Sequence, residues 1–297
     1  MIPARLNFAI ALGIVVANVA ALFFAASAPM LAKAAMAIAI ILSTPAHWAL
    51  VHEAIHGHLF ASRRANDIGG RLLAILFGLP FAAARFAHLR HHRYNRLPPA
   101  REEVFDETAQ SRIGAYAFHY FRIAYGLYAG ELAINALCFL PRAMLRRHLQ
   151  SLCPATDGVD YARAIQRTMQ TLGQIRIDAF CVIALFSAAI YADSGVLIAI
   201  IIGRGFIISQ LDHAPHHGTP LDNRDYALNM TAPRWLRGAL LNFNFHRNHH
   251  RQPQLPWKSL ALPQSFANDD ISFARAVLRQ WRGPIAASDE RIRARAT

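Results

Sequence analysis

The positions of the histidines limit the fold of this chain more than any other feature. Of the 15 histidines, 12 fall in four short clusters. The clusters are His52, His56 and His58; His88, His91 and His92; His213, His216 and His217; and His246, His249 and His250. Positions i, i+3 and i+4 of a helix share one face, so a cluster presents several imidazoles in one direction. Clusters that serve common metal ions must therefore meet on one side of the molecule.

The first cluster allows more than one interpretation. His52-Glu53-Ala54-Ile55-His56 has the H-x-x-x-H spacing and the H-E-x-x-H form of a zinc protease, with Glu53 as general base. It is also one Glu-x-x-His unit of a carboxylate di-iron bundle, but the chain has no second such unit. Two H-x-x-H-H clusters, at 88–92 and 246–250, add six imidazoles. Eight imidazoles suit two metal ions, whereas a zinc enzyme needs three protein ligands and a water.

Two long apolar segments at the start of the chain predict membrane helices. Residues 6–32 carry no charge and are long enough to cross a bilayer core of roughly 30 Å. Residues 34–51 are also apolar, are interrupted by Pro45 and run into the first cluster. Ala26-Ser27-Ala28 resembles a signal-peptide cleavage site. The second apolar segment favours an uncleaved hairpin instead, with both ends on the same side.

The distribution of charge indicates on which side of the membrane both ends of this hairpin lie. The formal net charge of +13 is carried almost wholly by arginine, since Lys33 and Lys258 are the only lysines. No nucleic-acid-binding motif is present, so we expect no nucleic-acid partner. Arginine-rich loops beside apolar segments are typical of the cytoplasmic side of a membrane protein. We therefore place the histidine clusters on the cytosolic side, at the cytoplasmic membrane if the source is bacterial.

The apolar segments in the middle of the chain must bring it back to the cytosolic side, because all four histidine clusters are expected there. Residues 68–84 are short and interrupted, which favours an interfacial or re-entrant helix. Residues 179–211 favour a hairpin that turns at Asp193. Alternatively they form one span, with 116–140 as the other. Either arrangement keeps an even number of crossings between the second and the fourth cluster.

These segments together predict one all-α membrane domain over residues 1–297. It has about four transmembrane helices in two hairpins, near 6–32, 34–51 and within 179–211, plus interfacial helices. The clusters 52–58, 88–92, 213–217 and 246–250 lie in a cytosolic, histidine-rich helical cap, and the tail 265–297 adds a further helical part.

The three histidine boxes resemble those of the integral-membrane fatty acid desaturase superfamily. The match consists of H-x-x-x-H, H-x-x-H-H and a late H-x-x-H-H followed by Pro256-Trp257, and it extends from about His47 to Trp257. The superfamily includes acyl desaturases, hydroxylases and carotenoid ketolases. The resemblance implies two iron ions held almost wholly by histidine, and O2 as co-substrate. The chain has no haem domain, iron–sulfur motif or G-x-G-x-x-G. Electrons should therefore come from an external ferredoxin, rubredoxin or cytochrome with its reductase.

On this basis each site residue has an expected role. The expected iron ligands are His52, His56, His88, His91, His92, His246, His249 and His250. The resemblance implies a ninth ligand from the third cluster. Pro215 disfavours a continuous helix there, so one of its three histidines should bind iron while another hydrogen-bonds nearby. We choose His217 as the ligand.

Other polar residues near the boxes also have expected roles. His58 should point away from the ligand face, and His47 should be a satisfied polar residue inside the membrane. Candidates for orienting the ligands, or for surface roles, are Glu53, Asp212 and Asp225. Asn242 and Asn244 could hold a metal-bound water or form a turn.

The expected function is O2-dependent oxidation of an apolar lipid chain, with fatty acyl desaturation first. A hydroxylase or a carotenoid ketolase or hydroxylase of the same superfamily is the alternative. An intramembrane zinc protease using His52, Glu53 and His56, with Asp222 as a third ligand, is a remote one.

Overall fold

The fold is almost entirely helical. The structure is a computed structural model, and it describes residues 1–297 except 98–100, 153–161, 222–224, 262–270, 291 and 293–297. Its strands are two residues long and form two parallel pairs: β1 (Val104–Phe105) with β4 (Ile285–Ala286), and β2 (Met230–Thr231) with β3 (Ile271–Ser272). The prediction of an all-α membrane protein is confirmed.

The first three helices form a hairpin with a bent second arm. Helix α1 (Ala4–Phe24) is followed by α2 (Met30–Leu42) and α3 (Thr44–His56). The predicted apolar segment 34–51 is divided between α2 and α3, which meet at an angle of 44° just before Pro45. Helix α3 ends at Gly57, whose φ of 84° is left-handed and so favours glycine. The first histidine cluster thus stands at the end of the second arm.

Helices α4 (Arg63–Phe77) and α5 (Phe81–Tyr94) form a sharply bent pair, with 96° between them. His56, before the pair, and His88, on α5, have their Nε2 atoms 3.0 Å apart. The chain therefore returns to the side it left, as a re-entrant segment does.

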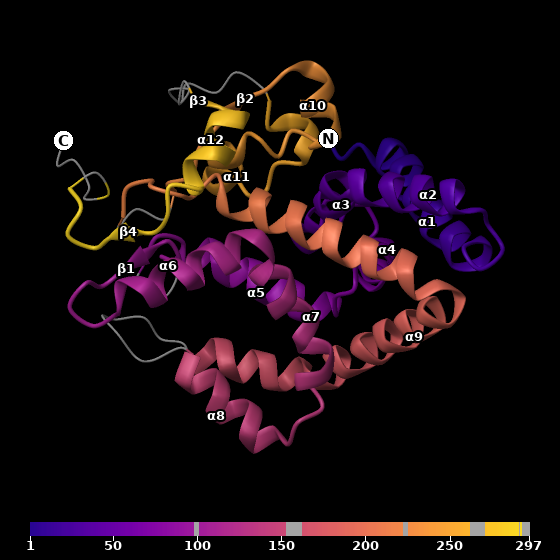
Figure 1. The fold of residues 1–297 in the computed structure, drawn as a ribbon, viewed down its shortest axis with the longest axis horizontal. Helices are drawn as coiled ribbons and strands as arrows, with labels where there is room; N and C mark the ends of the chain where they lie inside the picture. Colours follow the sequence, from indigo (N-terminus) through magenta and orange to yellow (C-terminus); the bar gives the residue numbers. More distant parts are fainter. Residues whose placement is uncertain (98–100, 153–161, 222–224, 262–270, 291, 293–297) are drawn as a thin grey trace.

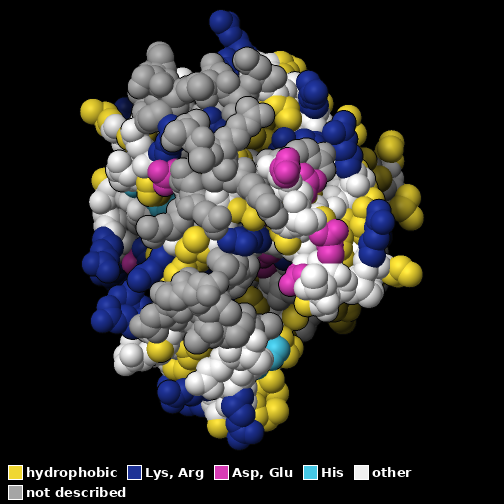
Figure 2. Space-filling view, turned by 90° about the vertical axis from the view of Figure 1, so that its left-hand side faces the viewer, with side chains coloured by type: hydrophobic (Ala, Val, Ile, Leu, Met, Phe, Trp, Pro, Cys, Tyr) yellow, Lys and Arg dark blue, Asp and Glu magenta, His cyan; other side chains and the backbone are white. Residues whose placement is uncertain are grey.

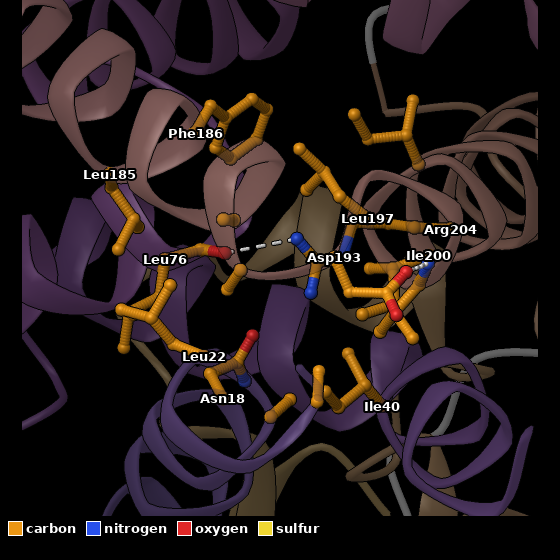
Figure 3. Close-up of a pocket in the computed structure, with 16 residues that line it drawn as sticks. Asn18, Leu22, Ile40, Leu76, Leu185, Phe186, Asp193, Leu197, Ile200 and Arg204 are labelled. Atoms are coloured by element: carbon orange, nitrogen blue, oxygen red, sulfur yellow. Dashed lines mark hydrogen bonds between the residues drawn. The ribbon is translucent and has the colours of Figure 1, made fainter. Parts of the chain in front are cut away.

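The bend leaves the last carbonyls of α4 without helical partners deep inside the protein. Arg204 Nη1 donates to the carbonyls of Leu76 and Phe77, at 3.0 Å each, and the Tyr128 hydroxyl donates to that of Phe77 at 2.6 Å. Figure 3 shows the Arg204 guanidinium reaching Leu76 across a cavity lined mostly by apolar side chains. Such carbonyls must be satisfied internally at membrane depth, and Arg204 provides two of the bonds.

A second helical stretch comprises α6 (Arg112–Phe121), the π-helical turn η2 (Arg122–Gly126) and α7 (Leu127–Leu137). Helix α8 (Arg142–Leu152) follows. Residues 116–137 of the alternative partner span 116–140 therefore lie in one continuous helical stretch that contains a π-bulge, a feature that often occurs at functional sites.

Helix α9 (Ala162–His213) forms the second hairpin. Asp193, with φ −163° and ψ 103°, interrupts its helical backbone, and Figure 1 shows the chain running out and back around this point. Lys33 Nζ lies 2.5 Å from Asp193 Oδ2, so an ion pair joins the turns of the two hairpins. The chain thus turns at Asp193, where the sequence places the turn of the preferred hairpin, and the membrane crossing of its two arms stays a prediction.

The helices have the length and surface that a membrane requires. Among the described residues, α1 and α9 are long and apolar enough to cross a membrane, and each of the bent pairs α2–α3 and α4–α5 also qualifies if taken as one span. Large apolar side chains such as Phe23, Phe180 and Ile202 are exposed on these helices. In a membrane protein such residues face lipid.

The remainder of the chain forms a cap over one end of the hairpins. The cap contains α10 (Arg234–Ala239), α11 (His246–Arg251), the 3₁₀ turn η3 (Trp257–Ser259) and α12 (Phe273–Gln280). Of the predicted helical tail over 265–297, the described residues form the short helix α12 with β3 before it and β4 after it, and residues 265–270, 291 and 293–297 lie outside the described part of the chain. In Figure 1 the cap lies at the opposite end of the molecule from the turn of α9.

Candidate metal centre

Nine histidines gather in two groups between the cap and the helices. One group is His52, His56, His88, His92 and His249, and the other is His91, His216, His246 and His250. Within each group the ligand atoms all lie within 4.8 Å of one another. They come from α3, α5, α11 and the turn after α9. All eight histidines expected from the first, second and fourth clusters are therefore brought together.

The two groups share an arrangement in which ring nitrogens converge. His52 Nε2 lies 2.9 Å from His249 Nε2, which is 2.8 Å from His92 Nε2. In the second group His246 Nε2 lies 3.0 Å from that of His216 and 3.2 Å from that of His250. When two imidazole nitrogens each lie about 2.1 Å from one metal ion and their bonds to it make a right angle, the two nitrogens are about 3.0 Å apart. The spacing fits nitrogens around a metal ion.

Hydrogen bonds between the rings account for this convergence less well. A hydrogen bond needs one protonated nitrogen and one bare nitrogen, and a neutral imidazole has a single proton to place. His88 Nε2 lies 3.0 Å from both His56 Nε2 and His92 Nε2, so three nitrogens compete for few protons. On the far side of the rings, the Nδ1 atoms of His52, His216 and His246 are buried and have no hydrogen-bond partner in the part of the chain that the structure describes. A metal ion satisfies the converging nitrogens as a set.

The charge state of the cap histidines suits metal binding. Burial lowers the pKa of His216, His246, His249 and His250 well below the usual 6.5, and neighbouring histidines lower it further. The imidazoles are therefore neutral at pH 7. Neutral imidazole is the form that binds metals.

The third cluster contributes His216 to the metal groups, whereas His217 was chosen from the sequence. Helix α9 ends at His213, and the amides of His216 and His217 both donate to the His213 carbonyl at 3.1 Å. In this tight turn, which the left-handed Gly218 (φ 67°) closes, consecutive side chains diverge. His217 Nε2 donates to the Gly283 carbonyl at 3.0 Å, away from both groups.

His217 belongs instead to a polar network that holds α12 in place. His213 Nδ1 lies 3.0 Å from Gln280 Oε1, and His119 Nε2 donates to the Gln280 carbonyl at 2.8 Å. Gln280 Nε2 in turn donates to Gln210 Oε1 at 2.7 Å. These contacts attach the end of α12 to α6 and α9, so His213 and His217 have a structural explanation.

A second network connects the start of the chain to the last histidine box. Glu53 Oε1 accepts from the amide of Trp257 at 3.2 Å, and the Trp257 indole donates to Asn7 Oδ1 at 2.9 Å. Asn7 Nδ2 donates to the carbonyls of His58 and Leu59. Glu53 therefore positions the segment after α11 relative to α3.

Asparagines hold the backbone around α11, and some of them have no obvious signal in the sequence. Asn229 Nδ2 donates to Asn248 Oδ1 at 2.8 Å, and Asn248 Nδ2 donates to the Leu260 carbonyl at 2.9 Å. Asn95 Nδ2 lies 3.4 Å from His250 Nδ1. Asn244 bonds the Met230 carbonyl, and Asn242 has a left-handed φ of 56°. Asn242 and Asn244 thus act in a turn, which was one of their two expected roles.

The other candidates lie around the centre. His47 Nε2 donates to the Leu73 carbonyl at 2.8 Å, but its Nδ1 is buried without a hydrogen-bond partner among the described residues, so the expectation of a satisfied polar residue holds for one of its two nitrogens. The His58 ring stacks on His56 outside the two groups. Asp212 lines a pocket that also contains Arg122, Glu131 and the ligand candidates His88, His91 and His216. Asp225 is exposed, and Asp222 lies outside the described residues.

The two groups are only partly buried. The side chains of His246, His249 and His250 are all less than a tenth exposed, whereas His56, His88, His91 and His92 are intermediate. Figure 2 looks at the molecule from the left-hand side of Figure 1, and among the described side chains of this face little of the cyan that marks histidine is visible. His88, His91 and His216 also line a pocket, which gives a small molecule a way to reach them.

The fold and the site define a class: a helical membrane protein with a two-part centre built from histidine alone. A family model for fatty acid desaturases matches residues 27–263, well over half of the chain. The chain therefore belongs to the fatty acid desaturase family, which acts on lipids as oxidoreductases. No curated protein and no solved structure matches it.

Proposed function

We propose that this protein is an O2-dependent, non-haem di-iron oxidoreductase that desaturates a fatty acyl chain. The observation that carries the proposal is the division of nine histidines into groups of five and four. In this proposal the first iron is held by His52, His56, His88, His92 and His249, and the second by His91, His216, His246 and His250. When bound, the two irons would supply reductive activation of O2 and oxidation of an unactivated C–H bond.

The protein's own residues orient and enclose this centre. The α3 and α5 helices fix five of the ligands on rigid backbone, and α11 fixes three. The Glu53–Trp257 hydrogen bond holds the segment after α11 against α3. The fourth histidine cluster is therefore tied to the first. The cap covers His246, His249 and His250 and so reduces the access of water, which protects reactive chemistry from side reactions.

A zinc protease is disfavoured by the number of ligands. His52 and His56 lie in a group of five histidines, whereas zinc is almost always four-coordinate and a catalytic zinc keeps one position for water. Glu53, the required general base, instead accepts a backbone hydrogen bond from Trp257.

The reductant in this proposal is an external protein of the ferredoxin, rubredoxin or cytochrome type with its reductase, acting on the cytosolic side. Exposed arginines such as Arg146 and Arg147 on α8 offer a positive surface to an acidic donor. Complementary charge mainly raises the association rate and is weakened by salt. Turnover at limiting donor should therefore fall as salt rises.

Lipid profiling of cells that express the protein tests the reaction. We expect a new unsaturated acyl chain with the wild type and none with His249→Ala. A new hydroxylated chain would assign a hydroxylase instead. A colour change in carotene-producing cells without any change in acyl chains would assign a carotenoid ketolase or hydroxylase. Metal analysis should give two irons per chain, and one zinc without iron would overturn the proposal.

A further inference from the structure

A basic groove lies on the opposite side of α5 from the metal centre. It is formed by α4, α5 and the first arm of α9, and its arginines include Arg63, Arg64, Arg90, Arg93, Arg163 and Arg167. Two further arginines, Arg71 and Arg85, line it together with a single carboxylate, that of Asp67. Like charges gathered in one concave surface repel one another unless an anion neutralises them.

The carboxylates near this groove are already engaged. Asp67 Oδ1 lies 3.2 Å from Arg85 Nη1, and Asp178 Oδ1 lies 3.8 Å from Arg71 Nε. Arg63, Arg64, Arg163 and Arg167 are exposed, and within the described residues none of them has a carboxylate partner. Among the described residues, no carboxylate therefore neutralises the positive charge of these four side chains.

Apolar side chains lie among the arginines. Ile68 and Leu89 line the groove and are 59% and 45% exposed. Further along the same helices, Leu72 on α4 and Ile177 and Phe180 on α9 are exposed as well. The groove thus lies where arginine-rich surface gives way to lipid-facing surface. Basic pockets at such boundaries recognise the headgroups of anionic lipids.

We propose that the basic groove binds an anionic phospholipid. Its phosphate is held by the arginines of α4 and α9, and part of its acyl chain lies along Ile68 and Leu89. Guanidinium groups bind phosphate oxygens through paired hydrogen bonds. An acidic protein would match the charge, but it would not match the apolar floor that continues into the lipid-facing surface.

The groove lies beside a helix that carries three histidines of the metal groups, so a bound lipid should also stabilise the metal centre. Helix α5 separates the groove from the metal groups and carries His88, His91 and His92 on its other face. A ligand that binds the folded α4–α5–α9 arrangement stabilises it by mass action. Anionic lipid should therefore raise the thermal stability of the holoenzyme.

The experiment compares two quadruple variants of the full-length holoenzyme. The groove variant is Arg63→Gln, Arg64→Gln, Arg163→Gln and Arg167→Gln. The control removes the same charge elsewhere, through Arg112→Gln, Arg234→Gln, Arg275→Gln and Arg282→Gln, all at exposed positions outside the groove and outside the proposed donor surface on α8. Retained phosphatidylglycerol and phosphatidylcholine are counted by native mass spectrometry. Melting temperature is measured in nanodiscs of each lipid.

We expect the wild type and the control to retain phosphatidylglycerol over phosphatidylcholine, and the groove variant to lose this preference by at least about tenfold. The rise in melting temperature with phosphatidylglycerol should also disappear in the groove variant alone. Equal retention by the groove variant and the control overturns the proposal. So does a groove variant that keeps its lipid but loses turnover only at limiting donor protein, since that outcome assigns the groove to a protein. Iron content and lipid profiles report on the proposed function separately.

Discussion

At the scale of single residues, His216 and His217 show how a turn separates two neighbours. Both amides donate to the same carbonyl, that of His213. His216 then faces His246, and His217 faces the backbone at Gly283. The two side chains therefore have different chemical tasks although they are adjacent in sequence.

Replacing these two histidines separately tests the assignment. His216→Ala should remove iron and activity together, because a direct ligand is lost. His217→Ala should keep most of the iron, with a loss of activity no larger than the about 10- to 100-fold typical of a supporting residue. Iron per chain, measured by elemental analysis of the purified variants, distinguishes the two. Full iron in His216→Ala beside iron-free His217→Ala would return the assignment to His217.

The sequence was sufficient to predict the direction of the histidine side chains that lie on helices. Spacing of i, i+3 and i+4 predicted that His88, His91 and His92 face one way, and the structure brings them together with the first and fourth clusters. It was insufficient for the third cluster because Pro215 and Gly218 end the helix there. Without a helical period, direction depends on backbone angles and on distant partners such as Gly283, which spacing does not contain.

A buried ion pair fixes the end of α5 to the third cluster. Arg96 has a left-handed φ of 65°, and its Nη2 donates to Glu103 Oε1 at 2.6 Å and to the Thr219 carbonyl at 2.9 Å. Both side chains are at most 3% exposed. The pair therefore connects α5, the following loop and the turn that carries His216.

Removing one partner of this pair should strongly destabilise the protein. Arg96→Met leaves the Glu103 carboxylate buried and unpaired, which costs about 3–5 kcal/mol. The double variant Arg96→Met, Glu103→Leu should recover part of that loss. Thermal unfolding in detergent measures both, with the exposed Arg93→Met as control. An Arg96→Met protein as stable as the control would contradict this account.

At the scale of elements, the two hairpins determine what lies at each end of the long helices. The ion pair of Lys33 and Asp193 marks one end. At the other end, Ile165 at the start of α9 packs with Tyr94 at the end of α5, near the metal groups. Both ends of α9 therefore lie on the side of the histidine clusters.

Cysteine labelling tests this topology. In a chain whose three native cysteines are replaced by serine, Ser194→Cys should react with a membrane-impermeant maleimide on intact cells. Gln166→Cys should react only after the cells are opened. Both positions are exposed in the structure, so accessibility reflects the side of the membrane. Labelling of both positions from outside would rule out the hairpin, and the reverse pattern would invert the orientation.

The sequence predicted the elements better than their bends. The interruption at Pro45 and the break around Gly78-Leu79-Pro80 were visible as residue types, and a re-entrant segment followed from the need to keep two clusters together. The angles of 44° and 96° depend on packing and on partners for the freed carbonyls. The role of Arg204 at the second bend could not be read from a single arginine within an apolar segment.

At the scale of the whole molecule, the buried histidines make stability depend on pH. Burial lowers the pKa of His246, His249 and His250 below 6.5 in the folded protein. As pH falls through about 6.5, the unfolded chain binds protons that the folded one does not, so stability falls. Acid also competes with metal for the same nitrogens.

We therefore expect the iron content and the melting temperature to decrease together between about pH 7 and pH 5. Dialysis at each pH followed by elemental analysis measures the first, and thermal unfolding in detergent measures the second. Metal-free protein should show the pH-dependent decrease in melting temperature too, because the histidines remain buried. A melting temperature that does not change over this range would contradict the prediction.

The order in which the chain is synthesised has a bearing on how such a centre is completed. His52 and His249 contribute to one group although they are 197 residues apart. At about 5–20 residues per second, the ribosome needs roughly 10–40 s to produce the second after the first. During this time the early helices are already synthesised, but each metal group still lacks the histidines of α11. If the two groups hold iron as proposed, neither site can be completed before α11 has been synthesised, and the supply of the metal after that point would determine how many finished chains become active.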